Sequence, residues 1–168
     1  MVAHDVPSHG ETTLTLDAAL SFLSNTDLDL YVEIKERGIA PAVIDKLVST
    51  NMARRSVVFA FADLAQFFPW EDTRRVRLGI IVPNPWNMDR VVNAHAPDVI
   101  LLGWDEREWT RIAFRAWWSV ISLERLARRC SATVVVGIVQ RATDIHWLSR
   151  QHVYGVVADM DFIDRAPR

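Results

Sequence analysis

Apolar residues along this chain gather in short runs that are rich in β-branched side chains, and such runs predict buried strands. Six of them lie at residues 28–34, 56–61, 77–82, 98–102, 133–139 and 154–158. A seventh strand is predicted from Met1 to Asp5. Segments with helical spacing lie between these runs, so the chain is expected to alternate between strands and helices.

Apolar residues at steps of three and four predict the helices. Thr15 is placed to cap the first helix, with Asp17 near its positive end. Pro41 suits the first turn of the second helix, where a missing N–H costs nothing. A short helix over residues 144–151 precedes the last strand. A long helix is predicted over residues 108–129, and its apolar stripe consists of Ile112, Ala116, Val120, Leu123 and Ala127.

Alternation of this kind implies a parallel sheet with right-handed crossovers, either an open doubly wound sheet or a (β/α)8 barrel. A doubly wound nucleotide-binding sheet should carry a glycine-rich turn after its first strand, whereas Gly10 stands alone here. The pattern therefore favours the barrel. A complete barrel typically takes about 250 residues, and this chain has 168. We expect an α/β fold, one TIM-type (β/α)8 barrel domain over residues 1–168 that is incomplete at its N-terminus.

Composition narrows the function classes. Half of the residues are hydrophobic, 24% are charged and the net charge is −2, which excludes a disordered chain. Cys130 is the only cysteine, so no disulfide can form within the chain. The near-neutral charge argues against nucleic acid or an anionic membrane as the main partner. No apolar stretch approaches the roughly 20 residues of a spanning helix, so no transmembrane segment is expected.

The predicted long helix carries two further features. Trp117 and Trp118 are adjacent, and adjacent helical residues point about 100° apart, so at least one of them should pack against the barrel. With acidic residues nearby, the arginines of this helix are interpreted as a solvated face rather than a nucleic-acid patch. These arginines are Arg111, Arg115, Arg125, Arg128 and Arg129.

Charged residues follow the strand at residues 28–34. Because side chains alternate along a strand, Glu33 and Lys35 share one face, and Val32 and Ile34 share the other. In a barrel, the charged face would lie inside, near the carboxyl end of the strand, where barrel enzymes place their chemistry. Inward charges need an ion, a substrate or each other as partners. The alternative is that Glu33 and Lys35 mark the exit of the strand into solvent and pair with each other.

Three segments of the chain together carry a resemblance to a known family. They read Val2-Ala3-His4-Asp5-Val6-Pro7, then Thr15-Leu16-Asp17-Ala18-Ala19-Leu20, then Leu30-Tyr31-Val32-Glu33-Ile34-Lys35. In order and spacing they resemble the glycerophosphodiester phosphodiesterase family, in which a His-Asp strand, a Thr-Leu-x-Glu-x-Leu helix start and an Ile-Glu-Ile-Lys strand follow one another. Residues 57–61 are similar to the family's strand ending in Ser-Phe, and residues 154–159 are similar to its last strand.

The resemblance implies a TIM-type barrel that hydrolyses glycerophosphodiesters to sn-glycerol 3-phosphate and an alcohol with a divalent cation, Mg²⁺ or Ca²⁺. It implies that His4 is a catalytic acid or base, that Glu33 is a metal ligand and that Lys35 lies against the substrate phosphate. Asp5 would orient His4. The expected partner is then a small-molecule glycerophosphodiester, and the expected compartment is the cytoplasm.

The chain also departs from the family pattern. The family begins with a strand ending in His-Arg-Gly and a second strand carrying Glu-x-Asp, and neither precedes His4 here. Ala60 stands where serine is usual, and Ala158 stands where threonine is usual. We therefore expect weak or no divalent-metal binding, and either a truncated form of an ordinary enzyme or a short degenerate relative. The alternative function is a non-catalytic barrel remnant that binds a phosphorylated ligand or a partner chain.

Overall fold

The computed structural model of the chain describes residues 14–70, 75–83, 86, 88–105 and 107–158. Strands and helices alternate along most of this part, and neighbouring strands pair in parallel, as the sequence predicts. The chain forms two compact units, Met1–Leu78 and Gly79–Arg168. The prediction of a single domain over residues 1–168 stays a prediction.

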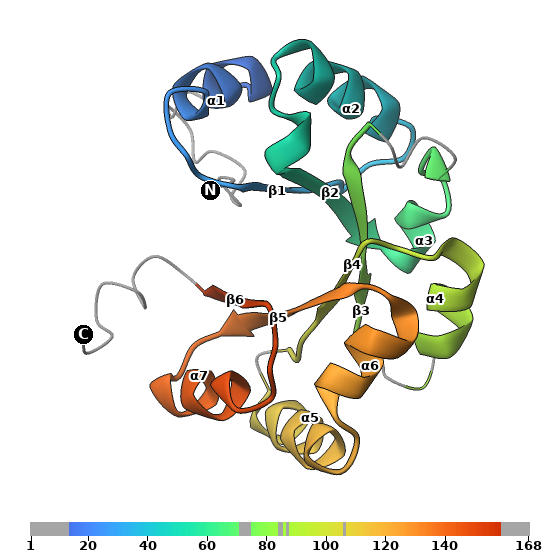
Figure 1. The fold of residues 1–168 in the computed structure, drawn as a ribbon, viewed down its shortest axis with the longest axis vertical. Coiled ribbons are helices and arrows are strands. Elements are labelled where there is room, and N and C mark those ends of the chain that lie inside the picture. Colours follow the sequence, from blue (N-terminus) through green and yellow to red (C-terminus); the bar gives the residue numbers. More distant parts are fainter. Residues whose placement is uncertain (1–13, 71–74, 84–85, 87, 106, 159–168) are drawn as a thin grey trace. The chain divides into compact units, whose positions relative to one another are not determined.

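The first unit builds one parallel strand pair. Its strands β1 (Leu30–Glu33) and β2 (Ser56–Phe61) lie side by side, with Leu30 opposite Ser56 and Glu33 opposite Phe59. The helices α1 and α2 lie on the same side of these strands (Figure 1), and Leu20, Ile44 and Leu47 are fully buried. The elements are α1 (Leu16–Leu23), β1 (Leu30–Glu33), α2 (Ala40–Ser49), η1 (Ala53–Arg55), β2 (Ser56–Phe61) and α3 (Ala62–Ala65).

The second unit contains parallel strands in chain order with helices between them. β3 begins in the first unit and ends in the second, and β3, β4, β5 and β6 then pair successively. A register shift lies between Val136 and Val139 in the β5–β6 pair. The elements are β3 (Arg77–Val82), α4 (Met88–His95), β4 (Val99–Leu102), α5 (Glu108–Val120), α6 (Leu123–Cys130), β5 (Thr133–Val139), α7 (Ala142–Ser149) and β6 (Gly155–Ala158).

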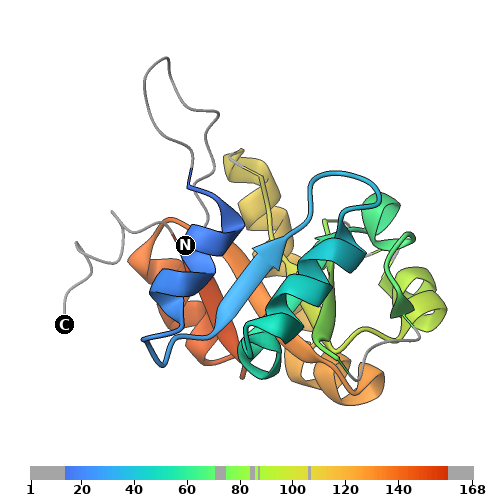
Figure 2. The ribbon, with the colours of Figure 1, turned by 90° about the horizontal axis from the view of Figure 1, so that it is seen from above.

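Most predicted elements are found where the hydrophobic pattern places them. β2, β3 and β5 match their predicted bounds, and β1, β4 and β6 begin one or two residues later than predicted. Thr15 caps α1, since its hydroxyl oxygen accepts a hydrogen bond from the Ala18 N–H at 3.2 Å. Pro41 lies in the first turn of α2 (Figure 2 shows this helix from above). The strand predicted from Met1 to Asp5 lies outside the described residues.

The prediction of one long helix over residues 108–129 is wrong. The chain leaves helical geometry at Ile121, which takes an extended conformation, and starts again as α6. Ser122 supports the new start because its hydroxyl accepts a hydrogen bond from the Arg125 N–H at 3.3 Å. A serine with extended backbone geometry is a favourable N-cap, so the break has a local cause.

The predicted apolar stripe of this helix is wrong as well in its α5 half. Ile112, Ala116 and Val120 are exposed, and the buried residues of α5 are Phe114 and Trp118. Leu123, on α6, is buried as predicted. Burial of Trp118 confirms that one of the two adjacent tryptophans packs into the protein.

Two glycines allow a close approach of backbones at the end of β4. A Cβ atom at Gly103 would overlap the carbonyl oxygen of Gly137 in β5. A Cβ atom at Gly137 would lie 2.5 Å from the Cβ of Val157 in β6.

No helix within the described ranges has the length and apolar character needed to cross a bilayer.

Candidate functional site

The carboxyl end of β1 presents two charged side chains on one face of the strand. Leu30, Val32 and Ile34 are buried, whereas Tyr31 and Glu33 are partly exposed. This alternation arises because successive side chains of a strand point to opposite faces. The apolar residues contribute to the core of the first unit, and the opposite face is left for Tyr31, Glu33 and Lys35.

Glu33 and Lys35 lie close enough to interact. The Lys35 Nζ atom is 3.9 Å from the Glu33 Oε2 atom, and the two side chains are 49% and 21% exposed. An ion pair of this exposure contributes little to stability, so it does not lock either side chain in place. This contact is also expected if the two residues only mark the exit of the strand into solvent. The geometry is therefore compatible with a ligand-binding role and with simple pairing at the surface.

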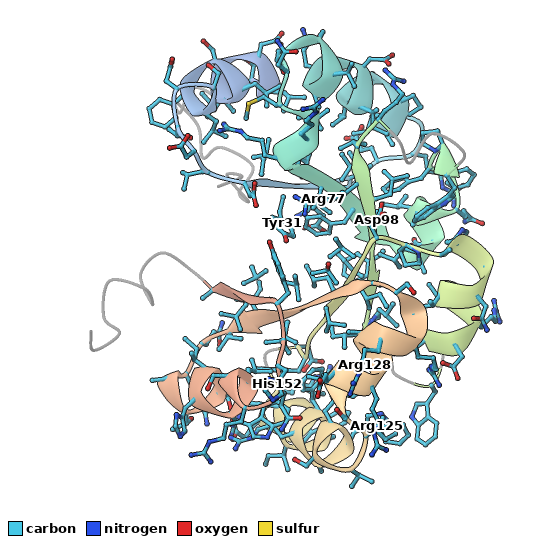
Figure 3. All side chains as sticks on the ribbon, in the orientation of Figure 1. Tyr31, Arg77, Asp98, Arg125, Arg128 and His152 are labelled. Carbon is cyan, nitrogen blue, oxygen red and sulfur yellow. The ribbon has the colours of Figure 1, made fainter. Side chains whose placement is uncertain are left out.

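Aromatic side chains and one arginine, Arg37, lie near this strand end within the first unit. The ring of Tyr31 (labelled in Figure 3) meets the ring of Phe59 edge-on, with centroids 6.2 Å apart. The Ile34 N–H donates to the Phe59 carbonyl at 2.8 Å, so pairing with β2 extends past the end of β1. The Arg37 guanidinium lies over the ring of Phe67, 4.9 Å from its centroid. Sequence reasoning missed Arg37, although it follows Lys35 by two residues.

Of the three residues predicted for the site, the structure describes two. His4, like Asp5, lies outside the described residues, so its distance from Glu33 and Lys35 stays a prediction. Among the described residues, no group of three or more His, Cys, Asp or Glu side chains could hold a metal ion. Ca²⁺ takes six to eight oxygen ligands, whereas Mg²⁺ keeps several waters and is usually held by one or two carboxylates together with substrate oxygens. Glu33, with a lysine ammonium 3.9 Å from its Oε2 atom, does not by itself form such a site within the described part of the chain.

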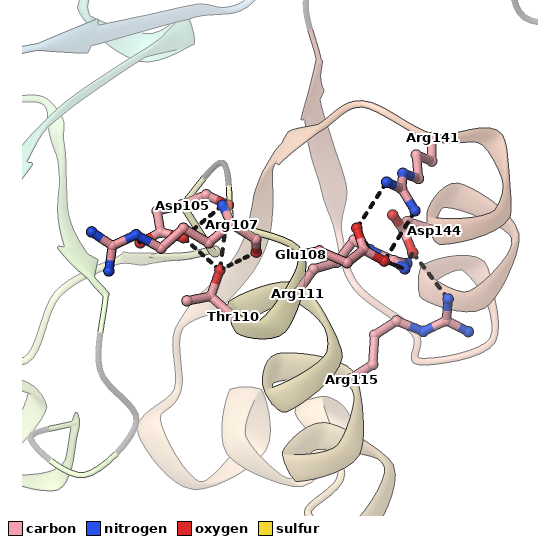
Figure 4. Close-up of polar contacts among 8 residues, drawn as sticks. All are labelled: Asp105, Arg107, Glu108, Thr110, Arg111, Arg115, Arg141 and Asp144. Atoms are coloured by element: carbon pink, nitrogen blue, oxygen red, sulfur yellow. Dashed lines mark hydrogen bonds and ion pairs between the residues drawn. The ribbon is translucent and has the colours of Figure 1, made fainter.

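A second polar cluster lies in the second unit and was not predicted. Asp144, in the first turn of α7, is buried, and its Oδ1 atom accepts hydrogen bonds from two arginines of α5 (Figure 4). The distances are 2.9 Å from Arg111 Nη1 and 3.0 Å from Arg115 Nη1. The expected solvated face is therefore wrong for these two arginines, because they face a buried carboxylate. The pairing joins residues 29 or more positions apart, which a helical pattern cannot reveal.

Surface carboxylates extend this cluster along α5. Arg111 also bonds to Glu108, which holds the pKa of that carboxyl below its usual range, and the same bond raises the pKa of Arg111. At the start of α5, the Thr110 hydroxyl and the Arg107 N–H donate to Asp105 and lower the pKa of its carboxyl. These contacts stabilise the start of α5. They give Asp105, Glu108 and Arg111 partners within the protein, so these charged groups do not need a bound substrate as a partner.

Comparison with known proteins identifies a shared fold. Among solved structures, the chain is similar to that of a putative glycerophosphoryl diester phosphodiesterase from Silicibacter pomeroyi DSS-3, with a TM-score of 0.62 and 16% sequence identity. The match covers 85% of this chain and 52% of that protein, so the chain spans about half the length of its structural neighbour. At this identity the similarity concerns the fold alone. It supports the α/β class and is consistent with an incomplete TIM-type barrel. No protein-family model and no curated protein matches the chain.

Proposed function

We propose that this chain takes part in the hydrolysis of glycerophosphodiesters to sn-glycerol 3-phosphate and an alcohol. The observation that carries the proposal is the placement of Glu33 and Lys35 at the carboxyl end of a parallel strand. In barrels, this end of the strands is where catalytic side chains gather. The fold shared with a protein described as a phosphodiesterase supports the same substrate class.

In this proposal, each predicted residue has a separate task. The Lys35 ammonium lies against the phosphate oxygens and offsets the negative charge that builds on them in the transition state. His4 transfers a proton, either from the attacking water or to the departing alkoxide, since an imidazole titrates near neutrality. Water adds to phosphorus, the P–O bond to the alcohol breaks, and the alcohol leaves with a proton. Asp5 orients the imidazole of His4.

The resemblance also implies a divalent cation, Mg²⁺ or Ca²⁺, with Glu33 among its ligands. The described residues supply one carboxylate at this strand end and no group of three ligands. They do not fit such an ion, and no step of the proposed reaction is therefore routed through one. The second candidate function is binding of a phosphorylated ligand without hydrolysis. The observation that favours it is the lack, among the described residues, of a group of three possible metal ligands.

Turnover of glycerophosphocholine by the full chain tests the proposal. Phosphorus NMR would follow the formation of sn-glycerol 3-phosphate with Mg²⁺, with Ca²⁺ and with a chelator. We expect turnover that falls at least about 10²-fold in Lys35→Met, as is typical when a group that acts on the reacting centre is removed. Lys46→Met is the matched control, because Lys46 carries the same charge on α2, where its half-exposed side chain pairs with Asp17, and its removal should leave the rate unchanged.

The outcomes separate the two functions. If the folded wild-type chain shows no turnover under any of the three conditions, hydrolysis by this chain is refuted. Titration with sn-glycerol 3-phosphate, followed by calorimetry, then addresses binding. Saturable binding that Lys35→Met weakens and Lys46→Met does not would support the non-catalytic function. Binding that is equal in both variants, or absent, would remove this strand end from consideration as a phosphate site.

A further inference from the structure

The outer face of α5 is a continuous apolar surface. It consists of residues spaced three, four or seven positions apart, which fall on one side of a helix. Trp109, Ile112 and Val120 are 63%, 56% and 86% exposed, and the alanines between them are exposed as well. A helix of 13 residues is about 20 Å long, so this stripe extends over most of that length. We call it the α5 stripe: Trp109, Ile112, Ala113, Ala116 and Val120.

The inner face of α5 already accounts for the packing of this helix. Phe114 and Trp118 are buried, and Phe114 contacts the rings of Trp104 and Trp147 at centroid distances of 5.0 and 6.3 Å. Arg111 is bonded to Asp144 on the same inner side. The α5 stripe therefore contributes nothing to the described core. Contiguous exposed apolar surface of this kind marks an interaction site.

The part of the chain that contains the α5 stripe has a surplus of positive charge. Residues 107–150 contain eight arginines and three acidic residues, a surplus of five positive charges in a chain whose net charge is −2. Asp105 and Asp89 lie outside this segment and form ion pairs with Arg107 and Arg129. Subtracting these two negative charges leaves a surplus of about three positive charges. Arg125 on α6 (Figure 3) is exposed and has no ion-pair partner among the residues that the structure describes.

A hollow with basic lining residues lies in the same unit as the α5 stripe. It has a volume of about 480 Å³ and lies between α5 and α7, with Arg115, His146, Trp147 and Arg150 among its lining residues. Arg115 is the residue before Ala116 on α5, and its guanidinium lies 5.4 Å from the ring centre of Trp147. Arg150, at the end of α7, is exposed. The hollow thus adds Arg150 to the exposed cationic groups of this unit, while Arg115 is paired with Asp144.

We propose that the α5 stripe, together with the exposed arginines Arg125 and Arg150, docks the protein onto an anionic lipid surface. Helices that lie in a membrane interface combine tryptophan and aliphatic residues on one face with basic residues around it. Basic side chains near an anionic membrane are attracted to its surface potential. A second copy of the chain fits less well, because symmetric packing of this face would bring its positive surplus against itself. The inference goes beyond the proposed function and is independent of turnover.

Vesicle co-sedimentation with the full chain tests this surface. We expect the wild-type protein to pellet with vesicles of phosphatidylcholine and phosphatidylglycerol, and to bind vesicles of phosphatidylcholine alone at least about tenfold more weakly. Ile112→Glu combined with Val120→Glu should abolish binding. Arg125→Gln combined with Arg150→Gln should weaken binding to the anionic vesicles about tenfold. Circular dichroism and thermal melts establish that each variant is folded.

Matched controls come from other exposed positions. Phe22→Glu removes a large exposed apolar side chain from α1, and Arg54→Gln removes an exposed arginine next to β2, so neither should change binding. The proposal is overturned if the folded wild type binds neither vesicle, binds both equally, or binds equally well after the α5 substitutions. Light scattering measures the oligomeric state of the wild type and of the α5 variant. A dimer that Ile112→Glu and Val120→Glu dissociate would assign the face to self-association and overturn the lipid proposal.

Discussion

Replacing Asp144 with alanine would remove the carboxylate that joins α5 to α7. The Asp144 side chain is 1% exposed and accepts hydrogen bonds from Arg111 and Arg115 at 2.9 and 3.0 Å. Its second oxygen, Oδ2, is buried without a hydrogen-bond partner. The substitution therefore removes two charge-assisted bonds and leaves two guanidinium groups facing an apolar gap between the helices.

The cost can be worked out from these contacts. Removing one partner of a buried ion pair typically destabilises a protein by about 3–5 kcal/mol. Arg111 keeps its bond to Glu108 and Arg115 keeps its contact with Trp147, so a loss of about 3 kcal/mol is expected for Asp144→Ala. Asp144→Asn retains the size and one acceptor oxygen but loses the charge, and a neutral acceptor bonds less strongly. We expect that variant to lose about 1–2 kcal/mol.

Urea unfolding measures both losses as changes in the midpoint at a constant m-value. Asp45→Ala serves as a control, because Asp45 forms an exposed ion pair with Arg75, and exposed pairs contribute about 0–1 kcal/mol. The reasoning is refuted if Asp144→Ala costs no more than Asp45→Ala. It is also refuted if Asp144→Asn costs as much as Asp144→Ala, since the charge and the volume would then have no separable effects.

Three further predictions concern local geometry. Gly103→Ala should cost at least about 2 kcal/mol in urea unfolding, because its Cβ overlaps a backbone carbonyl of β5; Gly155→Ala, which meets no atom within 4 Å, should be near neutral. Thr110→Val should raise the pKa of Asp105 toward its ordinary value in a carboxyl NMR titration, since it removes the largest cause of the lowering. Asp105 contributes stability above its unfolded pKa of about 4 and loses it as the pH falls through the lower folded pKa, so this variant should show a weaker acid-side dependence. Thr15→Ala should cost about 1 kcal/mol through loss of the α1 cap, and an unchanged midpoint would contradict that role.

The strands could be predicted from the sequence because their signal is local. In β2 and β5, runs of β-branched residues are bounded by polar residues or helix starts, so their limits match the structure. The face of α5 could not be predicted in the same way. Ile112, Ala116 and Val120 repeat with helical spacing, but so do Phe114 and Trp118, and spacing does not say which stripe faces the core. The choice depends on tertiary contacts.

The candidate site was predictable in part for a related reason. Strand alternation places Glu33 and Lys35 on one face of β1, and the burial of Val32 and Ile34 agrees with that prediction. Asp144 gave no signal, because its arginine partners lie on another helix and a single acidic residue in a helix is ordinarily exposed. Long-range pairing of this kind becomes visible only once the elements are packed.

The glycines at the end of β4 have a consequence for the diversification of this fold. At Gly103, main-chain atoms of β5 occupy the space that a side chain would need, and at Gly137 that space is taken by Val157 of β6. Natural or designed variation therefore cannot add side chains at these two positions without moving a neighbouring strand. New ligand preferences in the second unit would have to arise in the loops that follow the strands, where insertions and substitutions are tolerated.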